Sequence, residues 1–112
     1  MVIETRRDNG TLVIRAEDRL DLANAQVFHD ELDAAIESSE RAVVIDMSGL
    51  TYISSAGLRV IIQMLRRLQR QDARLALCSL STEVQNVFDT SGIGRLVDIQ
   101  PSRAEAIAAV SG

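Results

Sequence analysis

The sequence has little cysteine, few aromatic residues and no long apolar run. Cys78 is the single cysteine among 112 residues, so no disulfide within the chain is possible, as expected in a reducing compartment. Aromatic residues make up 3% of the chain, so the core must consist of Val, Ile, Leu and Ala. No apolar run approaches the roughly 20 residues that span a membrane, and the first residues do not resemble a secretion signal. We therefore expect a cytoplasmic protein without membrane insertion.

The chain also lacks an excess of basic residues. Its formal net charge is −4, whereas a nucleic-acid-binding protein usually presents a basic face, so we expect no nucleic-acid partner. There is no internal repeat and no linker rich in proline and glycine. A chain of 112 residues can bury its own core, and we predict a single domain over residues 1–112.

A turn signal predicts the first two strands. The β-prone residues 2–7 and 11–16 are joined by Asp8-Asn9-Gly10. Asn and Gly tolerate the positive φ angles that a tight hairpin turn requires. We therefore expect the chain to open with an antiparallel pair.

Four helices are predicted by apolar residues that recur three and four positions apart. Asp21 is the expected N-cap of the first helix and Ser81 of the third, which should stop near Gly92 and Gly94. Ser102 and Glu105 have the spacing of a capping box for the fourth. The apolar stripes consist of Leu22, Ala25, Phe28, Leu32, Ala35 and Ile36; of Leu58, Ile61, Ile62, Leu65 and Leu68; of Val84, Val87 and Phe88; and of Ile107 and Val110.

Short apolar runs between these helices predict buried strands. Residues 42–45 form a continuous run typical of a central strand covered on both faces, and residues 75–78 form a second. Residues 96–99 suggest an edge strand, and residues 47–55 a loop. Alternating helices and strands indicate an α/β fold with a mixed, mainly parallel β-sheet that starts with the N-terminal hairpin and carries about four helices.

The segment from Asp46 to Arg59 joins the most buried strand to the most amphipathic helix. Two serines, Ser54 and Ser55, stand at the expected start of that helix, where either hydroxyl could serve as an ordinary N-cap. The small residues around them would leave the hydroxyls accessible to another protein. A phosphate at this position would meet the positive end of the helix dipole, so the domain could accept it without unfolding.

These residues resemble a known family. Residues 45–50 (Ile-Asp-Met-Ser-Gly-Leu) and 55–58 (Ser-Ala-Gly-Leu) are similar to the STAS domain, specifically to bacterial anti-sigma factor antagonists. Leu20-Asp21 matches the Leu-Asp that precedes the family's first helix, and residues 88–92 match its Phe-Asp-x-Ser-Gly segment. The matches follow the family's order along nearly the whole chain. The resemblance therefore implies a STAS-type fold.

The resemblance also implies a partner-switching cycle. The unphosphorylated antagonist would bind an anti-sigma factor that is also a serine kinase of the GHKL type. Phosphorylation would release it, and a PP2C-type phosphatase would reset it. The family's acceptor lies two residues before the glycine, which here is Ser55, and Ser54 stands where relatives often have Asp. The implied partner-binding residues are Asp21, Ser54, Ser55, Ala56, Gly57, Leu58 and Arg59.

Other functions remain as alternatives. A STAS subunit of a transport system, or a signalling scaffold, would share the fold without a kinase cycle. A hydrolase with Ser55 as nucleophile would need a nucleophile elbow, but Ile53 stands where that motif has Gly. His29, the single histidine, is expected at the surface of the first helix and not as a base. Asp46 is expected to bond backbone groups in the loop that presents Ser55, and not a metal. We expect no enzyme activity and no cofactor.

Three arginines fall on one face of the second predicted helix. Arg59, Arg66 and Arg70 recur at helical spacing. We interpret this face as solvent-exposed, with a partner surface beside Ser55 as the alternative.

Overall fold

The computed structural model describes residues 2–111, which form a five-stranded sheet, four α-helices and a short 3₁₀-helix. The strands are β1 (Val2–Asp8), β2 (Thr11–Leu20), β3 (Ala42–Ile53), β4 (Arg74–Cys78) and β5 (Asp98–Gln100). The helices are α1 (Ala25–Ala35), α2 (Ser55–Arg70), α3 (Thr82–Ser91), η1 (Ile93–Arg95) and α4 (Arg103–Ser111). The predicted order of helices and strands is confirmed.

The sheet follows the chain in the order β1-β2-β3-β4-β5. Only β1 and β2 pair antiparallel, and the other three pairs are parallel. The turn between β1 and β2 has positive φ angles at Asn9 (50°) and Gly10 (87°), as the Asn-Gly signal predicts. Because β2 to β5 all run in one direction, their carboxyl ends meet at one end of the sheet.

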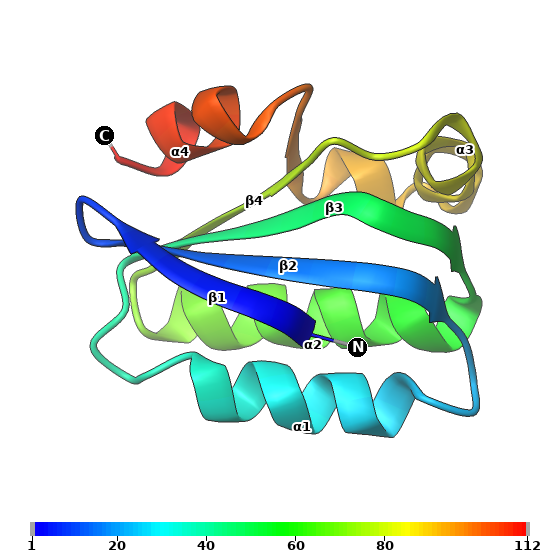
Figure 1. The fold of residues 1–112 in the computed structure, drawn as a ribbon, viewed down its shortest axis with the longest axis horizontal. Helices are drawn as coiled ribbons and strands as arrows, with labels where there is room; N and C mark the ends of the chain where they lie inside the picture. The colour runs from blue at the N-terminus through cyan, green and yellow to red at the C-terminus, as the bar shows by residue number, and fades with distance from the viewer. Residues whose placement is uncertain (1, 112) are drawn as a thin grey trace.

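Helices cover both faces of the sheet. In Figure 1, α1 and α2 lie on one face, α4 lies on the other, and α3 lies toward the end at which β2 and β3 finish. Phe28, Leu32 and Ile61 are fully buried in the core between the sheet and α1 and α2. A smaller core beneath α4 includes Val44 and Cys78, which confirms Cys78 as a buried core residue.

The third strand is much longer than the sequence predicts. Residues 47–53, expected in a loop, continue β3. They pair with β2, which is also longer than predicted and ends with Leu20 opposite Ile53. Met47, Leu50 and Ile53 are buried three positions apart, not two, because two register shifts interrupt the pairing of β2 with β3. Because a strand is recognised in a sequence by apolar residues at every second position, this spacing of three did not indicate a strand.

The predicted helix ends are partly confirmed. Ser81 caps α3 by accepting a hydrogen bond from the Val84 N–H, and Gly92 ends it at φ 79°. Ser102 accepts a bond from the Glu105 N–H at the start of α4. The edge strand comes later than predicted: β5 begins at Asp98 because the chain first closes the turn of η1.

The prediction that Asp21 is the N-cap of the first helix is wrong. The chain makes a turn at this point, and α1 begins at Ala25. The Asp21 carboxylate accepts a bond from the Ala23 N–H at 3.0 Å, within the turn. Leu22, predicted on the apolar stripe, precedes the helix and is 83% exposed.

A buried carboxylate attaches α4 to the central strand. Asp46 on β3 is 5% exposed. Its Oδ1 accepts a bond from the Ser48 N–H at 2.9 Å, and its Oδ2 accepts two from the Arg103 guanidinium at 3.0 and 2.7 Å. Burial alone would raise the pKa of Asp46, but the Ser48 N–H and the Arg103 guanidinium hold that pKa below its usual range.

We expect Asp46→Asn to lower the free energy of unfolding at pH 7 by about 1–3 kcal/mol, because the bonds to Arg103 lose their charge. The pKa of Asp46 is lower in the folded than in the unfolded chain, so its contribution is complete above the ordinary value of 3.8 and is lost as pH falls through the native value. In urea denaturation, the variant and the parent should therefore converge in acid.

Glu17→Gln is the matched control, because the Glu17 side chain is 43% exposed, in contrast to Asp46, and lies 3.6 Å from Arg15. It should cost no more than about 1 kcal/mol. An Asp46→Asn variant as stable as Glu17→Gln at pH 7 would contradict a stabilising role for the pair with Arg103.

Candidate functional site

The start of α2 is fixed to the ends of two strands. The Ser54 N–H donates to the Leu20 carbonyl at the end of β2 (2.9 Å), and the Ser54 carbonyl accepts the N–H of Leu58 (2.9 Å). The N–H of Ser54 thus continues the pairing of β2 with β3, and its carbonyl makes the first hydrogen bond of the helix. This connection places Ser55 at the carboxyl end of the parallel strands, where ligand and regulatory sites of such sheets gather.

Gly57 allows the helix to approach this end of the sheet closely. A Cβ atom at this position would lie 2.7 Å from Cγ of Leu20 and 2.8 Å from Cγ1 of Ile53. Leu20 and Ile53 are both buried, so neither has free space in which to retreat. The first turn of α2 can therefore pack on the strand ends only without a side chain at Gly57.

The two adjacent serines have different surroundings. Ser54 is half-buried, and its hydroxyl caps α2 by accepting the Gly57 N–H at 3.3 Å. Ser55 is exposed and is the first residue of the helix. The structure therefore assigns the cap to Ser54 and leaves the Ser55 hydroxyl accessible.

The charges along α2 favour an anion at its start. Its first turn contains no acidic residue, and Arg67 and Arg70 lie in its last turn. The positive end of the helix dipole is thus not compensated by a carboxylate of the helix itself. A negative group on Ser55 would be stabilised there.

Two hollows flank the first turn of α2. Toward α3, a hollow of about 390 Å³ is lined by Ser55, Leu58, Asn86, Val87, Thr90 and Ser91. Toward α1, a hollow of about 270 Å³ includes Leu22, Ala56 and Arg59. None of the residues that line the hollow beside Ser55 is charged. An apolar side chain of a partner would be accommodated there more readily than a charged one.

The predicted site residues gather at this end of the molecule but differ in exposure. Gly57 and Leu58 are buried and support the helix, whereas Ser55 and Arg59 are exposed. Arg66 and Arg70 are also exposed, which confirms the predicted solvent-facing side of α2. Asp21 lies in the turn before α1, within 3.9 Å of Arg19.

The sequence did not single out several neighbours of Ser55. Asn86, Val87 and Thr90 come from α3, about 30 positions later in the chain, and line the same hollow. Tyr52 is exposed at the end of β3, and the Arg19 guanidinium lies 4.4 Å from its ring centroid. The resemblance at residues 88–92 was the single signal that could have directed attention to α3.

The remaining candidates lie elsewhere. His29 is half-buried on α1, pairs with Asp30 at 3.2 Å and lines the hollow on the α1 side, not the one that Ser55 lines. Asp46 accepts a bond from the Ser48 N–H, in the segment that leads to Ser55 as predicted, and it also pairs with Arg103. Neither bond reaches the two serines themselves. Within residues 2–111, no three His, Cys, Asp or Glu side chains form a group suited to a metal ion.

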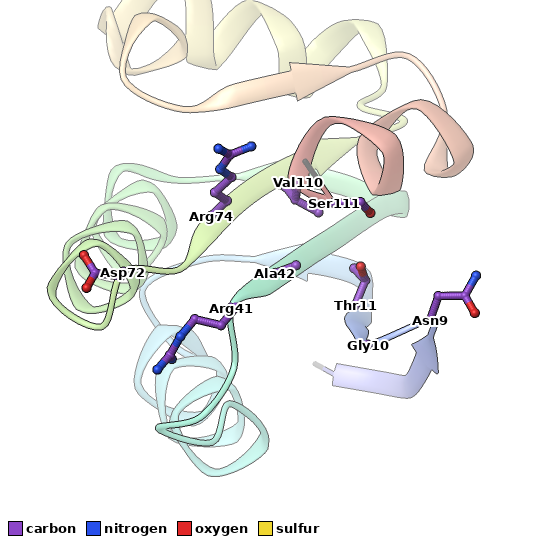
Figure 2. Close-up of a pocket in the computed structure, with 9 residues that line it drawn as sticks. All are labelled: Asn9, Gly10, Thr11, Arg41, Ala42, Asp72, Arg74, Val110 and Ser111. Carbon is purple, nitrogen blue, oxygen red and sulfur yellow. The ribbon is translucent and has the colours of Figure 1, made fainter.

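Another hollow, of about 370 Å³, lies at the opposite end of the sheet. It is lined by residues of the hairpin turn, the starts of β3 and β4, and the end of α4. Figure 2 shows that the side chains of Arg41, Asp72 and Arg74 point apart instead of converging on one point. This arrangement does not indicate a binding site. None of the helices within residues 2–111 is both long and apolar enough to cross a membrane.

We expect Gly57→Ala to lower the free energy of unfolding by about 1–3 kcal/mol, the usual cost of overpacking. The added methyl would meet Leu20 and Ile53, and this cost should exceed the gain of up to about 1 kcal/mol from replacing Gly in a helix. Gly94→Ala is the control, because its added Cβ would have ordinary contacts no closer than 3.5 Å. If chemical denaturation finds Gly57→Ala as stable as the parent, Leu20 and Ile53 can shift to accommodate the added methyl, and the close packing does not require Gly57.

Comparison with known proteins agrees with this fold. Residues 2–106 match the family model of the STAS domain. A Bordetella bronchiseptica relative named as the anti-sigma factor antagonist BtrV is 38% identical over 101 residues, covering 90% of this chain and 87% of the relative.

Two solved structures share the architecture. The unphosphorylated form of the anti-sigma factor antagonist SpoIIAA has a TM-score of 0.78 at 24% identity, over 96% of this chain and 94% of that one. A Thermotoga maritima structure, also named as an anti-sigma factor antagonist, has a TM-score of 0.90 at 20% identity, over 97% and 94% of the two chains. At these identities the structures show the fold alone. The match of the family model over residues 2–106 and the relative at 38% identity show that the chain belongs to the STAS domain family.

Proposed function

We propose that this chain is an anti-sigma factor antagonist whose binding to an anti-sigma factor kinase ends when Ser55 is phosphorylated. The role is supported by BtrV, a relative with 38% identity that is named as such an antagonist. The observation that carries the proposal is the division between the two serines: Ser54 caps α2, and Ser55 is exposed at its first position. The hydroxyl that a kinase would use is therefore not needed by the fold.

Phosphorylation would act through the surface and not by unfolding. The kinase would transfer the γ-phosphoryl group of ATP to the Ser55 Oγ and release ADP and a proton. The new group adds about −1.5 to −2 charges beside a hollow whose lining includes Leu58 and Val87 and no charged residue. Because α2 is already capped by Ser54, the domain keeps its shape while a neutral surface becomes strongly negative. An interface formed by this surface would have to bury the added negative charge.

The chain itself is proposed to have no enzymatic activity. The chemistry would come from its partners, a GHKL-type serine kinase and a PP2C-type phosphatase, acting in the cytoplasm. A STAS subunit of a transport system or a signalling scaffold is the alternative. Its affinity for its partner would not depend on phosphorylation of Ser55. A gene for such a kinase beside the gene for this chain would favour the antagonist, and one for a transporter the alternative.

The first test separates the two serines. Ser54→Ala should lower the free energy of unfolding by about 1 kcal/mol, the usual cost of a lost N-cap, and should still be phosphorylated. Ser55→Ala should keep the parent's stability and lose phosphorylation. Incubation with the cognate kinase and ATP, peptide mapping by mass spectrometry and urea denaturation measure both effects. Labelling that disappears in Ser54→Ala but persists in Ser55→Ala would show that Ser54, and not Ser55, is the acceptor.

The second test concerns affinity. Phosphorylation of Ser55 should weaken binding to the anti-sigma kinase by at least ~30-fold, because burying the added charge in an interface costs roughly 2–5 kcal/mol. Ser55→Ala should bind as the parent does. Ser55→Asp should weaken binding less than the phosphate, because it carries about one charge in place of nearly two. Calorimetric titration gives the order, and equal affinities for the phosphorylated and unphosphorylated chains would reject the switch.

A further inference from the structure

Arg59 is an exposed cation one helical turn after Ser55. Within residues 2–111, no hydrogen bond or ion pair is found for its guanidinium, although it lines the hollow between α1 and α2. Two other arginines on helices are engaged: Arg67 bonds Asp33 at 2.8 Å, and Arg103 bonds Asp46. Arg59 is therefore available for an interaction that the unmodified chain does not make.

Several charged side chains on the elements around Ser55 are engaged in other contacts. The residues of α3 that line its hollow are neutral, and Asp89 on that helix accepts a bond from Gln85 at 3.0 Å. On the side of β2 and β3, Arg19 lies over the Tyr52 ring and 3.9 Å from Asp21. On α1, Asp30 is bonded to His29 and Gln26. Arg59 is thus the nearest cation along α2 that is not already paired.

We propose that a phosphate on Ser55 forms an ion pair with Arg59 of the same chain. Side chains four positions apart on a helix face each other with Cβ atoms about 5–6 Å apart, and an anion placed before a cation is the favourable order. A guanidinium can donate two parallel bonds to a phosphate, which strengthens the pair. The pairing rests on the proposed function in one respect, namely that Ser55 is the residue modified.

The pairing changes what phosphorylation does to the surface. Modification adds a dianion and at the same time withdraws a free guanidinium from solvent. A partner that uses Arg59 as a donor in the unphosphorylated complex loses that donor when Ser55 is modified. Arg59 is therefore a positioning residue for the phosphate and a second element of the switch.

The test uses the full chain with phosphoserine encoded genetically at position 55, so that no kinase is required. The second pKa of the phosphate is measured by ³¹P NMR titration at low salt. It should be lower in the parent than in Arg59→Gln by about 0.15–0.4, because the cation stabilises the dianion. Arg59→Lys should recover part of this difference. Arg66→Gln removes an exposed arginine two turns farther along α2 and should titrate as the parent does.

A second readout is independent of the titration. The Arg59 Nε–H should exchange with solvent more slowly in the phosphorylated than in the unphosphorylated chain. Equal phosphate pKa values in the parent and in Arg59→Gln, with unchanged exchange, would overturn the pairing. Failure of the kinase to label Ser55 would instead reject the proposed function, and the encoded phosphoserine makes the two failures distinguishable.

Discussion

The arrangement of the candidate site depends on how closely α2 approaches the ends of β2 and β3. With a single hydrogen in place of a side chain at Gly57, the first helical turn packs directly on Leu20 and Ile53. The same approach brings the Ser54 N–H to the Leu20 carbonyl, so the end of the sheet and the start of the helix share one hydrogen-bonded connection. Side-chain packing beneath the helix thus determines which hydroxyl reaches solvent above it.

This arrangement gives the two serines complementary roles. Ser54 supplies an oxygen to the backbone at the start of α2 and is half-buried by that task. Ser55 has no such task and stands beside a neutral hollow. A group added to Ser55 leaves the cap, and with it the helix, in place. A switch of this kind needs no refolding step, and its energetic effect is confined to the surface that a partner would contact.

Local signals in the sequence were sufficient for much of the fold. Asn9-Gly10 predicted the hairpin because its backbone geometry depends on those two residues alone, and Ser81 predicted the start of α3 for the same reason. The extension of β3 could not be predicted, because its buried residues are spaced by register shifts that arise from pairing with β2. The cap predicted at Asp21 was wrong for a different reason. An aspartate carboxylate accepts a nearby backbone N–H both in a turn and at the start of a helix, so the sequence alone does not distinguish the two.

Long-range contacts of the fold and of the site could not be predicted from the sequence either. Arg103 bonds Asp46 across 57 positions, and no local spacing relates the two. The neutral residues of α3 meet Ser55 only through the folding of β4 and the connection that follows it. The candidate phosphorylation site itself was recognised from its motif, but the neutral surroundings that suit it to a switch appeared only in three dimensions.

The strand order has a further consequence for the sheet's two open edges. β1 forms one of them, and its residues from Glu4 to Asp8 are exposed and mostly charged, with an irregular register near its start. β5, at the other edge, contains three residues. Charges, irregular pairing and short length are the features by which natural sheets resist the addition of further strands. These features therefore protect both edges of the sheet from pairing with the backbone of another copy of the chain.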